Sequence, residues 1–178
     1  DRRYQEMRLD LEKKGINWAI SFFVLVFVLQ WLMLWLGSVL PIYDIIMYKD
    51  TKISYFEYVS VGVSVIGLFI NAVADRQLHS YIQQSKQGKK PQDTFCKRGL
   101  WKYSRHPNYV GQAMYFIGLS MWAYSVNGSW VSILGPYNII LLLVAYALPI
   151  MEKRMLAKEE RRKDYQQYIK DTPAMIFF

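Results

Sequence analysis

The sequence predicts an all-α polytopic membrane protein with about four transmembrane helices and an amphipathic C-terminal helix. Three observations lead to this prediction. Apolar residues make up 53% of the 178-residue chain and gather into long runs. The 22 Lys and Arg residues lie almost wholly between those runs. Strongly basic segments also alternate with segments that carry few cations, as the positive-inside rule requires of a membrane protein.

The N-terminal part contains one polar segment and the first predicted helix pair, over residues 16–74. Residues 1–15 are polar and predict a short surface helix. Residues 16–40 carry no charge, and a run of this length crosses a hydrocarbon core of roughly 30 Å. Pro41 is expected to end this helix. A second span is predicted at 53–73, where Glu57 is expected to reach the membrane interface from the first turn.

The C-terminal part contains a basic loop, a helix hairpin and a tail. The predicted loop, 75–107, holds eight Lys or Arg against two Asp. A third span at 108–125 begins after Pro107, since proline suits the first helical turn, and its Gly111 and Gly118 permit close helix packing. The tight turn at 127–128 joins it to a fourth span at 130–150, giving a hairpin over 108–152 that Pro136 and Pro149 are expected to bend. The tail, 153–178, begins as a charged helix.

The charge distribution predicts the topology of this single membrane domain. The N-terminal segment, the 75–107 loop and the tail hold 20 of the 22 cations, and four spans place all three on one face. Both termini are therefore expected on the cytoplasmic side, or on the matrix side in a mitochondrion. The expected location is the endoplasmic reticulum, the mitochondrial inner membrane or a bacterial inner membrane.

The composition argues against several function classes. The formal charge of +8 is not arranged as a free basic stripe with interleaved aromatic residues, so nucleic acid is not an expected partner. Membrane lipids are, and Lys86, Lys89 and Lys90 are expected to contact anionic headgroups. Cys96 is the single cysteine and cannot form an internal disulfide. The two histidines have no neighbours in the sequence that complete a metal shell, so no metal site is predicted.

The most informative stretch is 96–112, where four cations and a histidine precede Pro107 and an apolar run. A helix N-terminus ringed by cations suits a phosphate or carboxylate. The predicted hairpin brings this stretch near Glu152 and Arg154, and two tyrosines of the tail lie on the same face. No catalytic residue is assigned. The predicted cofactor-binding residues are Arg105, His106, Asn108, Tyr109, Gln112, Glu152, Arg154, Tyr165 and Tyr168.

Simpler readings of these residues stay open. His106 alone is compatible with an interfacial histidine that has no partner. Glu152, followed by two cations, is compatible with a surface ion pair of little energetic value. Tyr165 and Tyr168 are three residues apart, and simple packing at the membrane interface accounts for them equally well. The compact Arg-His-Pro-Asn-Tyr run is harder to explain by topology, which needs charge but not this order of residues.

The run from Gly99 to Gly111, GLWKYSRHPNYVG, resembles the signature of the steroid 5-alpha-reductase superfamily, in its poorly characterised C-terminal-domain branch. Two further segments resemble that branch: the Ala-Asp-Arg-Gln run at 74–77, and PIMEKRM at 149–155 followed by the tyrosines and Thr172. A related Arg-His-Pro-x-Tyr shape occurs in isoprenylcysteine carboxyl methyltransferases, which use S-adenosylmethionine. The Leu-Trp pair at 100–101 and the Glu-Lys-Arg run at 152–154 favour the reductase branch.

The resemblance implies an NADPH pocket and transfer of hydride to a carbon–carbon double bond conjugated to a carbonyl. Arg105, His106, Asn108 and Tyr109 would contact the cofactor, and the later acid, arginine and tyrosines would close over it. The chain departs from the family at Gln112, where members usually have an acid. Such proteins also have further N-terminal helices, whereas one clear span precedes the matching region here.

Three functions therefore remain open. The first is an NADPH-dependent reductase of a steroid-like or polyisoprenoid lipid. The second is a catalytically inactive accessory subunit, derived from such a reductase, in a larger membrane complex such as a mitochondrial one. The third is an S-adenosylmethionine-dependent methyltransferase.

Overall fold

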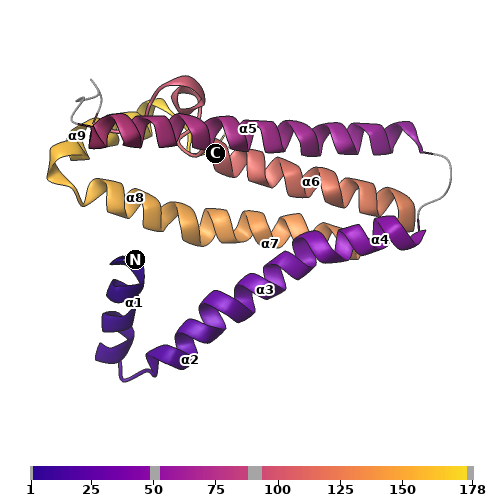
Figure 1. Ribbon diagram of the computed structural model, residues 1–178, viewed down its shortest axis with the longest axis horizontal. Coiled ribbons are helices and arrows are strands. Elements are labelled where there is room, and N and C mark those ends of the chain that lie inside the picture. Colours follow the sequence, from indigo (N-terminus) through magenta and orange to yellow (C-terminus); the bar gives the residue numbers. More distant parts are fainter. Residues whose placement is uncertain (1, 49–52, 88–93, 176–178) are drawn as a thin grey trace.

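The computed structural model describes residues 2–48, 53–87 and 94–175. Within these ranges the protein is helical apart from short connections (Figure 1). An isolated N-terminal helix, α1, spans Arg2–Lys13, where a surface helix was predicted. The other helices are α2 (Trp18–Phe22), α3 (Leu29–Leu34), α4 (Leu40–Tyr48), α5 (Tyr55–Lys86), α6 (Pro107–Asn127), α7 (Leu134–Leu142), α8 (Leu148–Leu156) and α9 (Glu159–Asp171).

The first long helix continues past Pro41, contrary to the prediction that this residue ends it. Helices α2, α3 and α4 follow one another without a break, joined by π-helical turns at Phe23–Val28 and Trp35–Val39. The second of these turns ends at Val39, two residues before the proline. A proline lacks the N–H for the usual helical bond and crowds the carbonyl four residues back, and a wider turn relieves both problems. Residues 41–48, which lie between the two predicted spans, are therefore helical.

The same arrangement recurs in the fourth predicted span. A 3₁₀ turn (Trp130–Ile133), α7, a π-helical turn (Leu143–Ala147) and α8 form one helical rod. Pro149 again stands two residues after the end of the π-helical turn. The rod extends to Leu156 and so beyond the predicted end at residue 150.

Helix α5 is longer than predicted, because the first third of the predicted basic loop is helical. It runs 32 residues, from Tyr55 to Lys86. Its start is fixed by a capping box in which the Ser54 hydroxyl accepts from the Glu57 N–H and the Glu57 carboxylate accepts from the Ser54 N–H at 2.6 Å. Glu57 is buried and serves as this cap, a role that was not predicted from the sequence. Lys86 ends α5, whereas Lys89 and Lys90 lie outside the described residues.

Helix α6 packs between its neighbours and forms the centre of the bundle. It contacts α5 most extensively and also contacts α4 and α7 (Figure 1). A methyl group on Gly111 would lie 2.5 Å from the backbone oxygen of Gly67 on α5, and one on Gly67 would lie 2.6 Å from the oxygen of Gly111. The glycines thus let the two backbones touch, as predicted for Gly111 and Gly118. Helix α6 ends at Asn127, and the next residue, Gly128, has a φ of 65° that suits a glycine C-cap.

Three of the described helical segments are long and apolar enough to cross a membrane. They are Leu29–Tyr48, Tyr55–Lys86 and Trp130–Leu156. Large apolar side chains are exposed along them, including Trp31 and Phe69, which are 63% and 69% exposed. Helix α6, with 21 residues, has the length of a span but is not among the three. Because other helices cover it, it can carry more polar and small residues than a helix that faces lipid. The fold is that of a polytopic all-α membrane protein.

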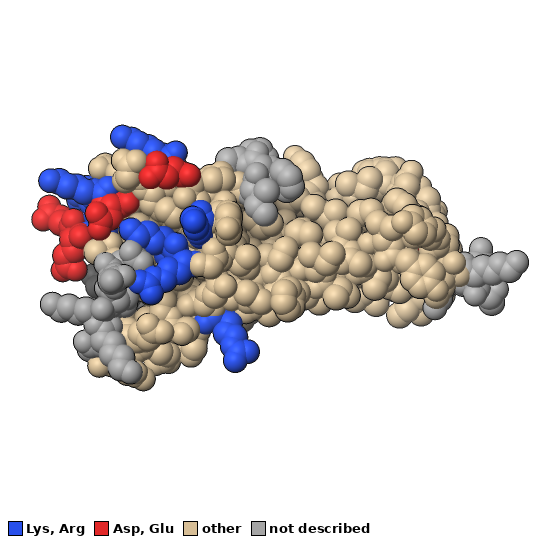
Figure 2. All heavy atoms as spheres, turned by 90° about the horizontal axis from the view of Figure 1, so that it is seen from above, with Lys and Arg blue, Asp and Glu red and all other residues tan. Residues whose placement is uncertain are grey.

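Charged residues gather at one end of the molecule, as the sequence predicts. Figure 2 shows Lys, Arg, Asp and Glu concentrated at one end, with a long surface free of charge beyond it. The start of α6, the end of α5, and helices α8 and α9 meet at this charged end (Figure 1). The predicted cofactor-binding residues belong to it.

Candidate functional site

Arg105 joins the start of α6 to three other segments of the chain. Its Nε donates to Glu152 Oε1 of α8 at 3.0 Å, and its Nη2 lies 2.7 Å from the same oxygen. Its Nη1 donates to the backbone oxygens of Ile169, at 2.9 Å, and Thr172, at 2.8 Å. Arg105 is only 9% exposed. The predicted approach of Arg105 to Glu152 is confirmed, and most of the guanidinium's donors bind the protein itself.

The segment after α9 folds back along the residues before α6. The N–H groups of Arg105 and His106 donate to the backbone oxygens of Pro173, at 2.9 Å, and Ala174, at 3.1 Å. The hydroxyl of Ser104 also donates to the Ala174 oxygen, at 3.0 Å. Met175 is buried against residues of α6 and α8. We call residues 172–175 the strap, because they cover the head of α6 from outside.

His106 is buried and neutral. Burial, and to a lesser extent the positive charge of Arg105, lowers the pKa of His106 from 6.5 to about 4. Its ring stacks on Tyr109, with centroids 5.4 Å apart and planes 9° apart. Its Nε2 lies 3.9 Å from Glu152 Oε1, too far for a hydrogen bond, and is buried without a hydrogen-bond partner. The carboxylate is already paired with Arg105, so it does not hold a proton on the imidazole.

Asn108 lies in the first turn of α6 and is tied to α5. Its Nδ2 donates to Asp75 Oδ1 at 3.1 Å, while its Oδ1 is buried without a hydrogen-bond partner. His106 and Asn108, which flank Pro107 at the start of α6, thus each carry an unpaired polar atom. Such buried atoms are rare in folded proteins, and none of the residues that the structure describes supplies either atom with a hydrogen-bond partner. Gln112 is half-buried one turn further along the same face of α6.

Tyr165 and Tyr168 pack beneath the residues before α6. The Tyr168 hydroxyl donates to the backbone oxygens of Trp101 and Ser104. Burial and the nearby Glu152 raise the pKa of Tyr165 to about 12, and burial and Tyr165 likewise raise that of Tyr168. Both phenols are therefore neutral hydrogen-bonding groups at neutral pH. Phe95 completes this cluster, with its ring centroid 5.2 Å and 5.1 Å from those of the tyrosines.

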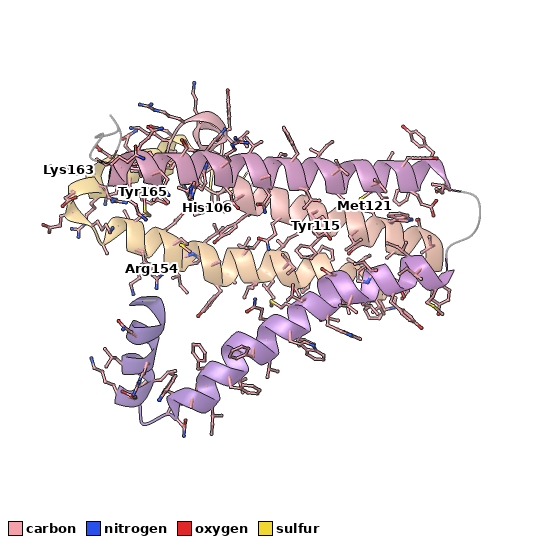
Figure 3. All side chains as sticks on the ribbon, in the orientation of Figure 1. His106, Tyr115, Met121, Arg154, Lys163 and Tyr165 are labelled. Carbon is pink, nitrogen blue, oxygen red and sulfur yellow. The ribbon has the colours of Figure 1, made fainter. Side chains whose placement is uncertain are left out.

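Arg154 is the predicted site residue that lies apart from the rest. It follows Glu152 by two positions, which turns it about 200° around α8. Figure 3 accordingly labels Arg154 on the opposite side of α8 from His106 and Tyr165. The other predicted residues lie together around the start of α6. The donor groups of Arg105 and Tyr168, however, form hydrogen bonds within the protein.

Sequence reasoning missed the contacts that α5 makes with this region. The indole N–H of Trp101 donates to the Ala74 oxygen, and Gln77 Oε1 accepts from the Leu100 N–H, both at 3.0 Å. Ala74 and Gln77, together with Asp75, belong to the Ala-Asp-Arg-Gln run at 74–77, which is one of the segments that carry the family resemblance. No chemical pattern within the run indicated that it would hold the 99–102 turn.

Two cavities open at the charged end. The larger, of about 440 Å³, is lined by residues of α5 between Val73 and Gln84 and by the segment 96–99. We call it the α5 groove. The smaller, of about 270 Å³, is lined by Lys97, Lys102 and residues of α9 and the strap, and Tyr168 is the predicted site residue on its wall. Among the residues that the structure describes, no cluster of three or more His, Cys, Asp or Glu side chains suits a metal ion.

The comparisons with known proteins give a family but no activity. No curated protein and no solved structure matches the chain significantly. One family model matches residues 1–172, and its description reads "Protein of unknown function (DUF1295)". Because the match covers nearly the whole chain, the protein belongs to the DUF1295 family.

Proposed function

We propose that the protein is a steroid 5-alpha-reductase-like membrane oxidoreductase, in which NADPH supplies a hydride to a conjugated carbon–carbon double bond of a lipid. The observation that best supports this is the pair of buried, unpaired polar atoms, His106 Nε2 and Asn108 Oδ1, at the head of α6. They stand in the motif whose resemblance to these reductases is most specific. A cofactor rich in hydroxyl, amide and phosphate groups offers partners to both atoms.

Two side chains at the start of α6 would offer such a group hydrogen bonds, and neither of them lines the two cavities described above. The neutral His106 accepts or donates one hydrogen bond at Nε2, and Asn108 accepts one at Oδ1. Contacts with the protein fix the orientation of both side chains, because the His106 ring stacks on Tyr109 and the Asn108 amide donates a hydrogen bond to Asp75. The strap lies against the same turn, because its Pro173 and Ala174 oxygens accept from the Arg105 and His106 N–H groups. Lys97 and Lys102 line the smaller cavity together with Asp164 and Asp171, and these lysines are the groups there that a phosphate would contact.

Thermal unfolding of the detergent-purified protein with NADPH, with S-adenosylmethionine and with neither tests the proposal. A ligand at 100 times its dissociation constant adds about 2.7 kcal/mol to the free energy of unfolding. We expect stabilisation by NADPH, its loss in Asn108→Ala and His106→Asn, and its retention in Tyr103→Phe, since Tyr103 is 69% exposed. A response to S-adenosylmethionine instead of NADPH would favour the methyltransferase. A response that survived both site variants would place the cofactor elsewhere.

A second candidate is an accessory subunit without catalysis. The observation that favours it is the internal use of Arg105, whose donors hold α8, the end of α9 and the strap. A motif that serves packing alone would look the same in this respect. This candidate predicts no stabilisation by either cofactor and co-purification with other subunits from native membranes in mild detergent.

A further inference from the structure

We propose that the α5 groove is a binding site for an anionic phospholipid, with the headgroup phosphate at its cationic end and an acyl chain along the outer face of α5. The site is separate from the head of α6. It does not depend on the proposed reductase activity.

The groove has a strong charge bias. Arg76 on α5 and Lys97 and Arg98 on the facing segment line it, and no acid is among the described residues that do so. All three cations are exposed. Ser80 and Gln84 add neutral hydrogen-bonding groups to the α5 wall. Within the groove lining, three cations stand beside neutral polar groups, a combination that suits a phosphate, although Lys97 also borders the smaller cavity that Asp164 and Asp171 line.

The groove continues into a lipid-facing stripe. The α5 residues that line it follow helical spacing from Val73 to Gln84, and so lie on one face. One and two turns before Val73 on the same face are Phe69 and Ile66, which are 69% and 52% exposed. At 1.5 Å per residue, the stretch from Ile66 to Arg76 measures about 15 Å. This face of α5 is therefore apolar from Ile66 to Val73 and becomes cationic at the groove. A phospholipid has the same order, with an apolar acyl chain followed by a phosphate.

The position along the molecule agrees with a lipid occupant. Figure 2, which looks down on the side where α5 lies, shows a surface free of charge over most of its length, with basic and acidic side chains together at the charged end. The groove lies at that transition, where headgroups meet hydrocarbon in a bilayer. The face that packs on α6, around Gly67 and Ala74, lies on another side of α5. A lipid in the groove would leave the α5–α6 contact and the Asp75–Asn108 hydrogen bond intact.

Native mass spectrometry of the protein released from mixed phosphatidylglycerol and phosphatidylcholine nanodiscs tests this proposal. We expect the wild type to retain one phosphatidylglycerol in preference to phosphatidylcholine. In the double variant Arg76→Gln/Arg98→Gln, the ratio of bound phosphatidylglycerol to bound phosphatidylcholine should fall roughly thirtyfold. This is the change expected when two cations that attract an anionic lipid are removed. The matched control Lys163→Gln/Lys170→Gln removes two exposed cations from α9 and should retain the lipid.

Three outcomes would overturn the proposal. The first is equal loss in both double variants, which would indicate unspecific attraction by net charge. The second is competition by inorganic phosphate or dihexanoyl phosphatidylglycerol as effective as that of the long-chain lipid, which would indicate an anion site without a chain track. The third is retention of phosphatidylglycerol by Arg76→Gln/Arg98→Gln. Equal thermal stability of the two double variants in neutral lipid confirms that the comparison reports on binding.

Discussion

Mild acid should destabilise the protein through one residue, His106. The folded state holds this imidazole neutral, with its pKa lowered from 6.5 to about 4 by burial and by Arg105. An unfolded chain takes up a proton near pH 6.5, whereas the folded chain resists until about pH 4. The stabilising contribution is therefore complete above about pH 7 and is lost as the pH falls from about 6.5 to about 4. With about 1.4 kcal/mol for each pKa unit, the loss reaches roughly 3 kcal/mol.

Unfolding by sodium dodecyl sulfate in mixed micelles, at a series of pH values between these limits, measures this term. His106→Gln keeps a polar side chain without an ionisable group, so its unfolding free energy should lack the term. Carboxylates are common to both proteins and largely cancel in the difference. Wild type should lose roughly 3 kcal/mol more than His106→Gln over this range.

The control is His79→Gln, because His79 is exposed near the end of α5 and its substitution should leave the wild-type pH profile unchanged. Parallel profiles for wild type and His106→Gln would refute the reasoning. They would mean that the imidazole reaches water in the folded state, or that Glu152 gives up its pairing with Arg105 to charge it.

Two further predictions concern packing and pairing at the bundle centre. Gly111→Ala should lower the free energy of unfolding by about 2–3 kcal/mol in the same assay, since the added methyl group would lie 2.5 Å from backbone atoms of α5. Gly62→Ala is the control. Its methyl group would meet nothing within 4 Å, so this variant should be neutral or slightly stabilising. Arg105→Met should lower the free energy of unfolding by about 3–5 kcal/mol, because it leaves the Glu152 carboxylate and the Ile169 and Thr172 carbonyl oxygens without their partner. Arg8→Met, which breaks an exposed ion pair with Glu12, should change it by no more than about 1 kcal/mol.

The helices could be predicted from the sequence because their signals are local. Runs of apolar residues, Pro107 at a helix start and Gly128 at a helix end each act within a few positions. The errors arose where tertiary structure outweighs a local rule. A proline such as Pro41 would end an isolated helix, but packing of α4 against α6 stabilises the helix beyond it. The π-helical turn before Pro41 accommodates the hydrogen bond that the proline cannot donate. The extension of α5 to Lys86 is supported by contacts with the 99–102 turn, which no local pattern announces.

The candidate site was predictable only in part, for a similar reason. The Arg105–Glu152 pair followed from topology, because a hairpin of known direction fixes which ends meet. The strap did not follow, because backbone carbonyls bind Arg105 and any residue type supplies a carbonyl. The α5 groove also escaped, because its cations come from two segments that were assigned to one loop.

These contacts change which residues of the motif can report on function. Arg105 fixes α8, the end of α9 and the strap at once, and its planar fork suits that task better than a lysine. Packing alone therefore accounts for an arginine at this position, and loss of activity after its substitution would carry no information about a cofactor. Asn108 differs, because α5 uses its amide nitrogen and leaves its oxygen unpaired. Asn108→Asp keeps the size and an acceptor oxygen but places a second carboxylate beside Asp75. Asn108→Ala removes the acceptor without adding charge. If NADPH binding falls in both variants while the fold persists, the head of α6 serves a ligand as well as the bundle.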